Sequence, residues 1–236
     1  MKKLLLLALI AVALPALAAD ISMNTAVNSR YVWRGLLVNN HAVFQPDLTV
    51  AGSGFEFNVW GSMDLTDNYN NQFEFNEVDY TLSYNWHTSR AEWSAGVISY
   101  VFPNTALSST TEAYVGVTLK HLAFSPSVTA YYDFDEVDGL YLEFGTSHEF
   151  ENGISLGATL GYASKDYVDG YFVVDGDVGA AFTDYSISVD YPVALRLGEL
   201  HLNITYTNLV DTHIHSPGFR NGDNNLIFGV NWSYNF

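Results

Sequence analysis

The stretch Leu226-Ile-Phe-Gly-Val-Asn-Trp-Ser-Tyr-Asn-Phe236 decides the fold of this chain. Large apolar side chains alternate there with small or polar ones, and a β-strand places the two sets on opposite faces. The apolar face carries Phe228, Val230, Trp232, Tyr234 and Phe236. A strand between lipid and a watery lumen needs this pattern, so the stretch favours a transmembrane barrel over the last strand of a soluble β-protein.

These five residues resemble the C-terminal strand of bacterial outer-membrane barrels, which ends in alternating aromatic residues and a final Phe. In that class of protein the strand is an assembly signal. The resemblance implies that the barrel assembly machinery and periplasmic chaperones are partners of this chain.

Residues 1–18 are expected to be a cleaved secretory signal. Two lysines precede an apolar run, and the small-residue site Ala16-Leu17-Ala18 follows it. The run is shorter than the about 18 residues that a membrane span needs, and the chain contains no Cys that could carry a lipid anchor or form a disulfide. Residues 19–236 are therefore expected to form one barrel domain in the outer membrane of a Gram-negative bacterium.

The composition excludes some partners. The formal net charge is −17, which argues against nucleic acid as a partner and against a basic surface for anionic lipid. The chain has 16 Tyr, 15 Phe and 5 Trp although its mean hydropathy is only +0.06. A polar average with many aromatic residues is typical of strands that alternate between lipid and lumen.

About twelve runs of alternating residues follow one another, each about as long as a tilted transmembrane strand of 9–11 residues. Short turns fall near residues 52–54, 87–90, 121–124, 151–153 and 193–198, and longer connections near 35–42, 66–74, 103–110, 135–138, 164–177 and 211–223. Outer-membrane barrels have short periplasmic turns, longer outer loops and an even strand number. We predict an all-β, antiparallel up-and-down barrel of about twelve strands, with ten or fourteen as alternatives.

Charged residues in these runs share the polar face, and the apolar face carries no Asp, Glu, Lys or Arg. A lipid-facing Arg or Lys at mid-bilayer costs about 2–4 kcal/mol. The predicted pore-lining residues are Arg30, Arg34, Glu56, Trp60, Asp64, Glu77, Asp79, Tyr100, Tyr114, Lys120, Tyr131, Asp133, Glu143 and Asp190. On the apolar face, Tyr31, Trp33, Tyr132 and Phe134 are predicted to form the outer aromatic girdle, and Trp86, Trp93, Trp232 and Phe236 the periplasmic one.

Carboxylates outnumber cationic groups on the polar face, which favours passage of cations. Arg30 and Arg34 have two interpretations. They either face Glu77, Asp79 or Asp64 across the lumen and form a constriction, or they are neutralised by lumen carboxylates and hold the barrel shut. The inward aromatic residues are likewise either a track for solutes or packing.

Ser29-Arg-Tyr-Val-Trp-Arg-Gly35, with Gln45-Pro46 ten residues later, resembles the opening signature of the TorF family of porins, also known as the conserved hypothetical Gcw_chp family. The resemblance covers residues 29–61 and implies a signal peptide, a barrel and a porin-like role. The sequence departs from the family pattern at Val43-Phe44, where Pro-Ala is common, and in the residues after Gly35.

We expect a channel for passive diffusion of small hydrophilic solutes, with no cofactor and no metal site. The alternative is a closed structural or adhesive barrel. An outer-membrane hydrolase is the least favoured interpretation, because no nucleophile, base and orienting partner occur at a recognisable spacing. The acidic outer loops lack the spacing of a calcium loop and His213, His215 and His201 lack that of a zinc site. We expect the loops to meet lipid and lipopolysaccharide through divalent cations.

Overall fold

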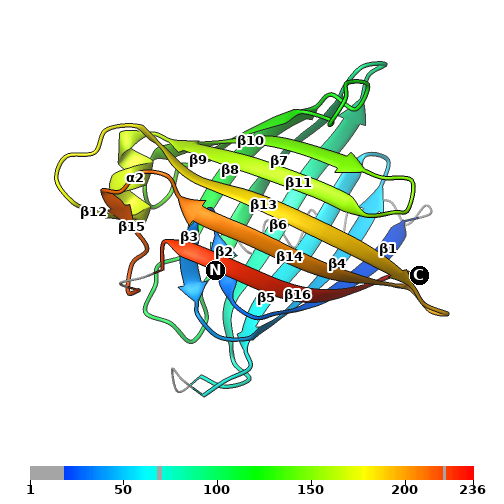
Figure 1. The fold of residues 1–236 in the computed structure, drawn as a ribbon, viewed down its shortest axis with the longest axis horizontal. Coiled ribbons are helices and arrows are strands. Elements are labelled where there is room, and N and C mark those ends of the chain that lie inside the picture. Colours follow the sequence, from blue (N-terminus) through cyan, green and yellow to red (C-terminus); the bar gives the residue numbers. More distant parts are fainter. Residues whose placement is uncertain (1–18, 68–70, 220–221) are drawn as a thin grey trace.

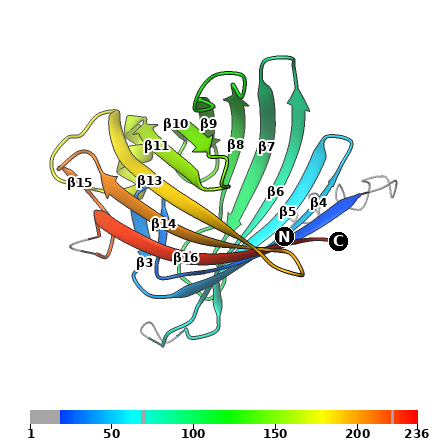
Figure 2. The same cartoon turned by 45° about the vertical axis from the view of Figure 1, so that its right-hand side comes forward.

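The computed structural model describes residues 19–67, 71–219 and 222–236, and the strands of this part form a closed antiparallel barrel (Figures 1 and 2). Its twelve strands among the described residues are β1 (Asp20–Asn28), β4 (Val43–Gly52), β5 (Phe55–Asp64), β6 (Phe75–His87), β7 (Glu92–Val101), β8 (Thr110–Thr118), β9 (Ser127–Asp133), β10 (Gly139–Glu149), β11 (Ser155–Ala163), β13 (Ala181–Ala194), β14 (Glu199–Leu209) and β16 (Asn224–Asn235). Each strand pairs with its neighbour in the chain, and β1 closes the barrel on β16. The predicted fold class and strand number are confirmed, whereas the predicted signal sequence lies outside the described residues.

The two ends of the barrel differ. Short turns join β4 to β5, β6 to β7, β8 to β9, β10 to β11 and β13 to β14 at the end where β1 begins and β16 finishes, which we call the periplasmic end. The opposite end, which we call the outer end, carries the longer connections and the remaining elements: β2 (Tyr31–Trp33), β3 (Leu36–Asn39), α2 (Lys165–Tyr171), β12 (Val173–Val174) and β15 (Ile214–His215). The alternation of short and long connections is confirmed except around β9, where the β8–β9 connection (119–126) is longer than the β9–β10 connection (134–138). The longest connections build structure over one mouth of the barrel (Figure 1).

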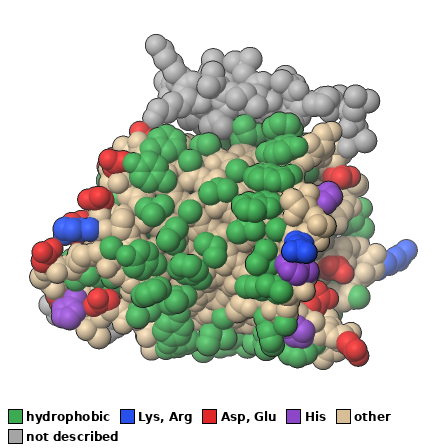
Figure 3. Space-filling model, turned by 90° about the horizontal axis from the view of Figure 1, so that it is seen from above, with side chains coloured by type: hydrophobic (Ala, Val, Ile, Leu, Met, Phe, Trp, Pro, Cys, Tyr) green, Lys and Arg blue, Asp and Glu red, His purple; other side chains and the backbone are tan. Residues whose placement is uncertain are grey.

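The outer surface of the barrel is apolar between its ends. Apolar side chains cover the middle of the wall, and most charged side chains gather toward its two ends (Figure 3). On β13, Ile187, Val189 and Tyr191 are exposed on the outside, whereas Ser186 and Asp190 point into the lumen. No helix among the described residues is long and apolar enough to cross a bilayer.

The C-terminal stretch 226–236 lies in and just after β16, which is part of the barrel wall as predicted. Phe228, Val230 and Phe236 are exposed on the outside of β16, and Trp232 stacks on Tyr234 with ring centroids 5.9 Å apart. Trp86 stacks on Trp93 at 6.0 Å, near the same end. These rings lie where the periplasmic girdle was predicted.

A charged side chain on the lipid-facing middle of the wall should destabilise the barrel. We expect Ile187→Arg, halfway along β13, to lower the free energy of unfolding in lipid vesicles by about 2–4 kcal/mol, because the guanidinium would enter the bilayer core. Ile21→Arg, at the periplasmic end of β1, is the matched control and should cost about 0–1 kcal/mol. Denaturant titration in vesicles measures both, and equal losses would contradict the placement of the membrane.

Candidate functional site

A hairpin of β2 and β3 folds from the barrel wall into the lumen. The chain bends after β1, where the backbone N–H of Ser29 donates to the carbonyl of Phe228 at 2.8 Å. The two strands are joined by Arg34 and Gly35, both with positive φ (48° and 79°), as a tight two-residue hairpin turn requires. A Cβ on Gly35 would lie 2.4 Å from the Cβ of Asp184, so this close approach to β13 needs glycine.

The placement of Tyr31 and Trp33 in the outer lipid-facing girdle was wrong. Tyr31 packs against Trp60 on the inner face of β5, with ring centroids 5.6 Å apart, and Trp33 contacts Tyr100 at 5.8 Å. Both lie inside the barrel because the chain leaves the wall before residue 31. Lumen rings bury these side chains as well as lipid would, and the alternation of residues 23–33 is the same in both cases.

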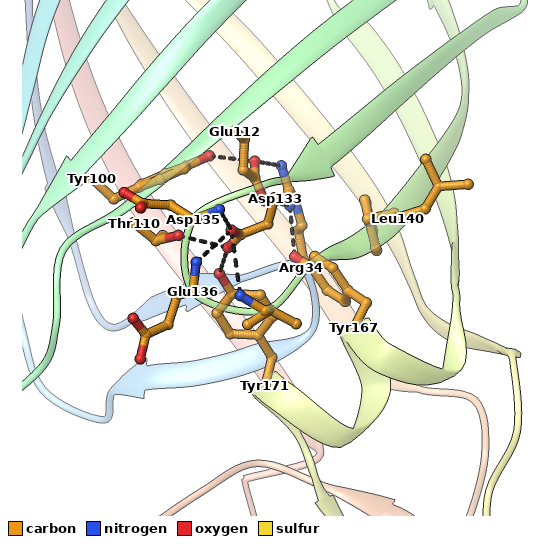
Figure 4. Close-up of polar contacts among 12 residues, drawn as sticks. Arg34, Tyr100, Thr110, Glu112, Asp133, Asp135, Glu136, Leu140, Tyr167 and Tyr171 are labelled. Carbon is orange, nitrogen blue, oxygen red and sulfur yellow. Dashed lines mark hydrogen bonds and ion pairs between the residues drawn. The ribbon is translucent and has the colours of Figure 1, made fainter.

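Arg34 lies at the tip of the hairpin and binds the far wall of the lumen (Figure 4). Its guanidinium donates to both carboxylate oxygens of Glu112 on β8, at 2.7 and 2.8 Å. It also donates to the hydroxyl of Tyr167 on α2 at 2.6 Å, and Tyr100 donates to Glu112 at 2.9 Å. The side chains of Arg34 and Glu112 are 8% and 0% exposed, so this is a buried, bidentate ion pair.

Aromatic rings surround the same guanidinium. Its central carbon lies 4.6 Å from the ring centroid of Trp33, 4.1 Å from that of Tyr131 and 4.6 Å from that of Tyr141. Such cation–π contacts are worth about 2 kcal/mol or more when the cation is desolvated. Ion pair and rings together fix the hairpin to β8, β9 and β10, so we call Arg34, Glu112, Tyr131, Tyr141 and Tyr167 the Arg34 cluster.

The predicted partners of the arginines were not the ones observed. Asp64 accepts hydrogen bonds from Asn39 and from Asn76, the latter at 2.9 Å, and Glu77 binds the hydroxyl of Tyr31. Arg30 donates to Asn225 of β16 at 3.0 Å. Sequence reasoning missed Glu112, although it shares the inward parity of Tyr114 on the same strand, because parity alone does not tell which residue lies opposite.

Asp133, one of the predicted pore-lining residues, holds the outer connections in place. Its buried carboxylate accepts from Thr110 at 2.7 Å, from Tyr171 on α2, and from the backbone N–H groups of Asp135 and Glu136 at 3.0 and 3.1 Å (Figure 4). These bonds fix α2 and the β9–β10 connection over the outer mouth.

The helix itself begins with a local signal. The Ser164 side chain caps it by accepting from the backbone N–H of Tyr167 at 3.4 Å, and Asp166 lies in the first turn. Tyr141 then joins β10 to β13 through Asp184, at 3.1 and 3.2 Å. We call α2 and the β9–β10 connection the lid. The hydroxyl of Tyr171 and the carboxylate of Asp133 tie this lid to the wall.

The other predicted lumen residues divide into two groups. Glu56, Asp79, Glu143, Tyr114 and Asp190 are on inward faces of wall strands, and His201 binds Asp190 at 2.7 Å. Lys120 lies two residues beyond the end of β8, so the predicted end of this strand was wrong. Its side chain pairs at 2.7 Å with Glu92, which lines the cavity at the periplasmic end, in a largely exposed contact.

Two cavities flank the Arg34 cluster. The one at the outer end, which we call the vestibule, has a volume of ≈ 560 Å³ and is bounded by the hairpin, α2 and the outer ends of β6, β7 and β8. The other, ≈ 420 Å³, lies toward the periplasmic end and is lined by residues such as Ser94, Tyr114 and Tyr131. Tyr131 of the Arg34 cluster lines this second cavity, which we call the lower cavity. Trp33 and Tyr100, which contact Arg34 and Glu112, line the vestibule, so the cluster adjoins both spaces.

His215 joins three outer segments. Its Nδ1 lies 2.8 Å from Asp223, and its Nε2 lies 3.3 Å from Asp175 beyond β12. The hydrogen bond to Asp223 raises the pKa of His215 above its ordinary value. His213 contacts Asp211 and His201 contacts Asp190, and no group of His, Asp and Glu in the described ranges is arranged to hold a metal ion.

The Arg34 cluster should dominate the stability of the hairpin. We expect Glu112→Ala to lower the free energy of unfolding by about 3–5 kcal/mol, because Arg34 would keep a buried, unpaired charge. The double variant Arg34→Ala, Glu112→Ala should lose less than the sum of the single variants. Glu92→Ala, which breaks the exposed pair with Lys120, is the control at about 0–1 kcal/mol; an equal loss there would refute the burial of the cluster.

The His215 contacts should be sensitive to pH. Because the pKa of His215 is raised in the folded state, its stabilising contribution is complete below the ordinary imidazole pKa of about 6.5 and is lost as pH rises through the folded value. Hydrogen exchange of β12 and β15 should therefore accelerate with pH beyond the intrinsic chemical increase. His215→Asn should abolish this extra increase and His213→Asn should retain it; an unchanged profile in His215→Asn would contradict the prediction.

Comparison with known proteins gives a family and a fold. A search of curated proteins found no match. The NanC porin is 10% identical, with a TM-score of 0.54 over 92% of this chain and 99% of its own. The COG4313 outer membrane channel from Pseudomonas putida F1 is 10% identical, with a TM-score of 0.50 over 93% and 96%. Outer membrane phospholipase A from Escherichia coli is 11% identical, with a TM-score of 0.48 over 91% and 89%.

The similarities to the NanC porin and the COG4313 channel are at the level of the fold alone, that of an outer-membrane barrel. The model of a bacterial protein family of unknown function, Gcw_chp, matches residues 13–221. That range includes the hairpin and eleven of the twelve wall strands described above. The chain belongs to the Gcw_chp family.

Proposed function

We propose that the protein is a porin-like channel of the Gram-negative outer membrane, through which small hydrophilic solutes diffuse passively, with cations preferred. The observation that carries the proposal is a lumen with inward carboxylates and two cavities, next to a hairpin whose tip is held by the Arg34–Glu112 pair. This role agrees with that of the TorF porins, which the signature at residues 29–35 resembles.

The preference for cations follows from the lumen charges. Inward carboxylates occur on β4, β5, β6, β8, β10 and β13, namely Asp47, Glu56, Asp64, Glu77, Asp79, Glu112, Glu143, Asp184 and Asp190. Arg34 at the tip of the hairpin is neutralised by Glu112, and Arg30, just before the hairpin, donates to the neutral Asn225. Charged groups along a pore set its selectivity, and here the remaining field is negative.

The hairpin is the constriction in this proposal. It crosses the lumen at the level of the Arg34 cluster, and its residues Trp33 and Leu36 also line the vestibule. Displacing its tip would join the vestibule to the lower cavity. The width available to a solute therefore depends on how firmly Glu112, Tyr131 and Tyr141 hold Arg34.

A closed structural or adhesive barrel is the second candidate, and the same cluster favours it. A bidentate pair under aromatic rings could keep the lumen shut permanently. A hydrolase has less support: His148 points outward between Phe124 and Phe150, with ring centroids at 5.2 and 4.8 Å, and the neighbouring Ser147 belongs to the other face.

The proposed partners follow from the two ends of the barrel. Phe236 and the alternating residues before it would present the assembly signal to the barrel assembly machinery and periplasmic chaperones. At the outer end, Lys165 binds Asp169 and Asp177 at 3.0 and 2.9 Å. Further exposed acidic groups there would reach lipopolysaccharide phosphates through divalent cations.

Single-channel recording tests the proposal. The refolded protein in a planar bilayer should give discrete conductance steps, and a KCl gradient should give a reversal potential of the sign for K⁺ selectivity. Arg34→Ala with Glu112→Ala should raise the conductance several-fold, because the variant hairpin loses its anchor. His148→Ala, on the outward face of β10, is the control and should conduct like the wild type. A correctly folded barrel without steps, in both wild type and double variant, would establish the closed barrel instead.

A further inference from the structure

The vestibule has the size of a ligand site. Its ≈ 560 Å³ lies within the range of about 300–1,000 Å³ that is usual for pockets of small molecules. It is enclosed by segments far apart in the sequence, namely the hairpin, α2 and the connections around Phe102, Val137 and Pro217. Asp133 and the Arg34 cluster fix the hairpin, α2 and the connection around Val137. The backbone N–H of Leu37 donates to the hydroxyl of Ser216 at 3.1 Å and ties the connection around Pro217 to the hairpin, so most of the wall is preformed.

Its walls are aromatic and apolar. Tyr31, Trp33, Tyr100, Phe102, Leu107 and Tyr171 contribute to them. Trp33 meets Tyr100 and Tyr171 edge to face, with ring centroids 5.8 and 5.3 Å apart, so its position is set from two sides. Ring faces carry negative electrostatic potential and attract organic cations.

The charge of the cavity has one sign. Its lining residues include the carboxylates of Glu77 and Glu136 and no Lys, Arg or His among the residues that the structure describes there. Glu77 lies deep on β6, is 5% exposed and binds the hydroxyl of Tyr31. Arg34 at the tip of the hairpin does not line the cavity, and both arms of its guanidinium are directed at Glu112.

The remaining polar groups are few. Thr110 lines the cavity but donates its hydroxyl proton to Asp133, and Ser108 lies in the connection before β8. A sugar needs many hydrogen-bonding partners and an anion needs a positive one, and the vestibule offers neither. The combination fits a solute with one positive charge and an apolar body.

We propose that the vestibule binds hydrophobic ammonium compounds, with the ammonium group beside Glu77 and the aromatic or aliphatic body against Trp33 and Phe102. This proposal deepens the proposed function. Passage of these compounds through the barrel rests on the channel function. The binding itself is independent of conductance. It adds to the small hydrophilic solutes of the proposed function one class of amphipathic cation that the outer mouth would take up.

Calorimetric titration of the purified protein with 2-phenylethylammonium tests the site. The wild type should bind this compound more tightly than 3-phenylpropionate, which reverses the charge, and than tetramethylammonium, which lacks the aromatic body. Glu77→Gln should raise the Kd by about tenfold or more, because a buried charge partner is removed while the shape is kept. Glu56→Gln, the same change on the inner face of β5 outside the cavity, is the matched control and should bind like the wild type.

Phe102→Ala supplies a second variant, because it lies in a connection and leaves the wall and Glu77 intact. It should weaken 2-phenylethylammonium and leave tetramethylammonium unchanged. Equal affinity of the wild type, Glu77→Gln and Phe102→Ala would overturn the site and indicate partition into detergent. Binding with the expected pattern but no conductance would support the ammonium site and refute the channel. Conductance without this binding pattern would support the channel and refute the ammonium site.

Discussion

A buried positive charge organises the interior of this barrel. Arg34 is cut off from bulk water, and a desolvated guanidinium persists only where a carboxylate and hydrogen-bond acceptors meet it. Glu112 and Tyr167 supply these, and Trp33, Tyr131 and Tyr141 supply ring faces. This contact depends on the turn with Gly35, on the path of the hairpin and on the position of α2.

The cluster also connects the outer loops to the lumen. Tyr167 of α2 binds Arg34, and Tyr171 of the same helix binds Asp133, whose carboxylate holds the β9–β10 connection. A displacement of the helix would therefore break contacts at the hairpin tip and at the outer mouth together. Any opening of the lumen on the proposed mechanism involves the lid and the hairpin as one unit.

The barrel wall and its contents follow different physical rules. In the wall, each strand satisfies its backbone through its neighbours, and alternate side chains meet lipid or lumen. In the lumen, burial and charge pairing determine which side chains meet. The resulting interior is negatively charged and has aromatic surfaces. The proposed preference for cations and the proposed ammonium site both come from this second set of rules, because the wall alone would accept many different interiors.

Local periodicity was enough to determine the wall. The alternation in runs such as Phe55–Leu65 and Leu226–Phe236 gave the strand number, the outer face and the inward direction of Glu77 and Asp79, because the face of a residue in a wall strand depends only on its parity. The end of β8 was predicted two residues too late, at Lys120 instead of Thr118, because local signals are weakest at strand ends.

Only the tertiary structure decided what meets inside the barrel. Tyr31 and Trp33 continue the parity of β1, yet they lie in the lumen, because an aromatic ring is satisfied by lipid or by other rings and the sequence pattern is the same. Glu112 is the partner of Arg34 although 78 residues separate them. Such a pair depends on barrel closure, on the bend after β1 and on the turn at Gly35, which together set distances across the lumen that no local pattern encodes.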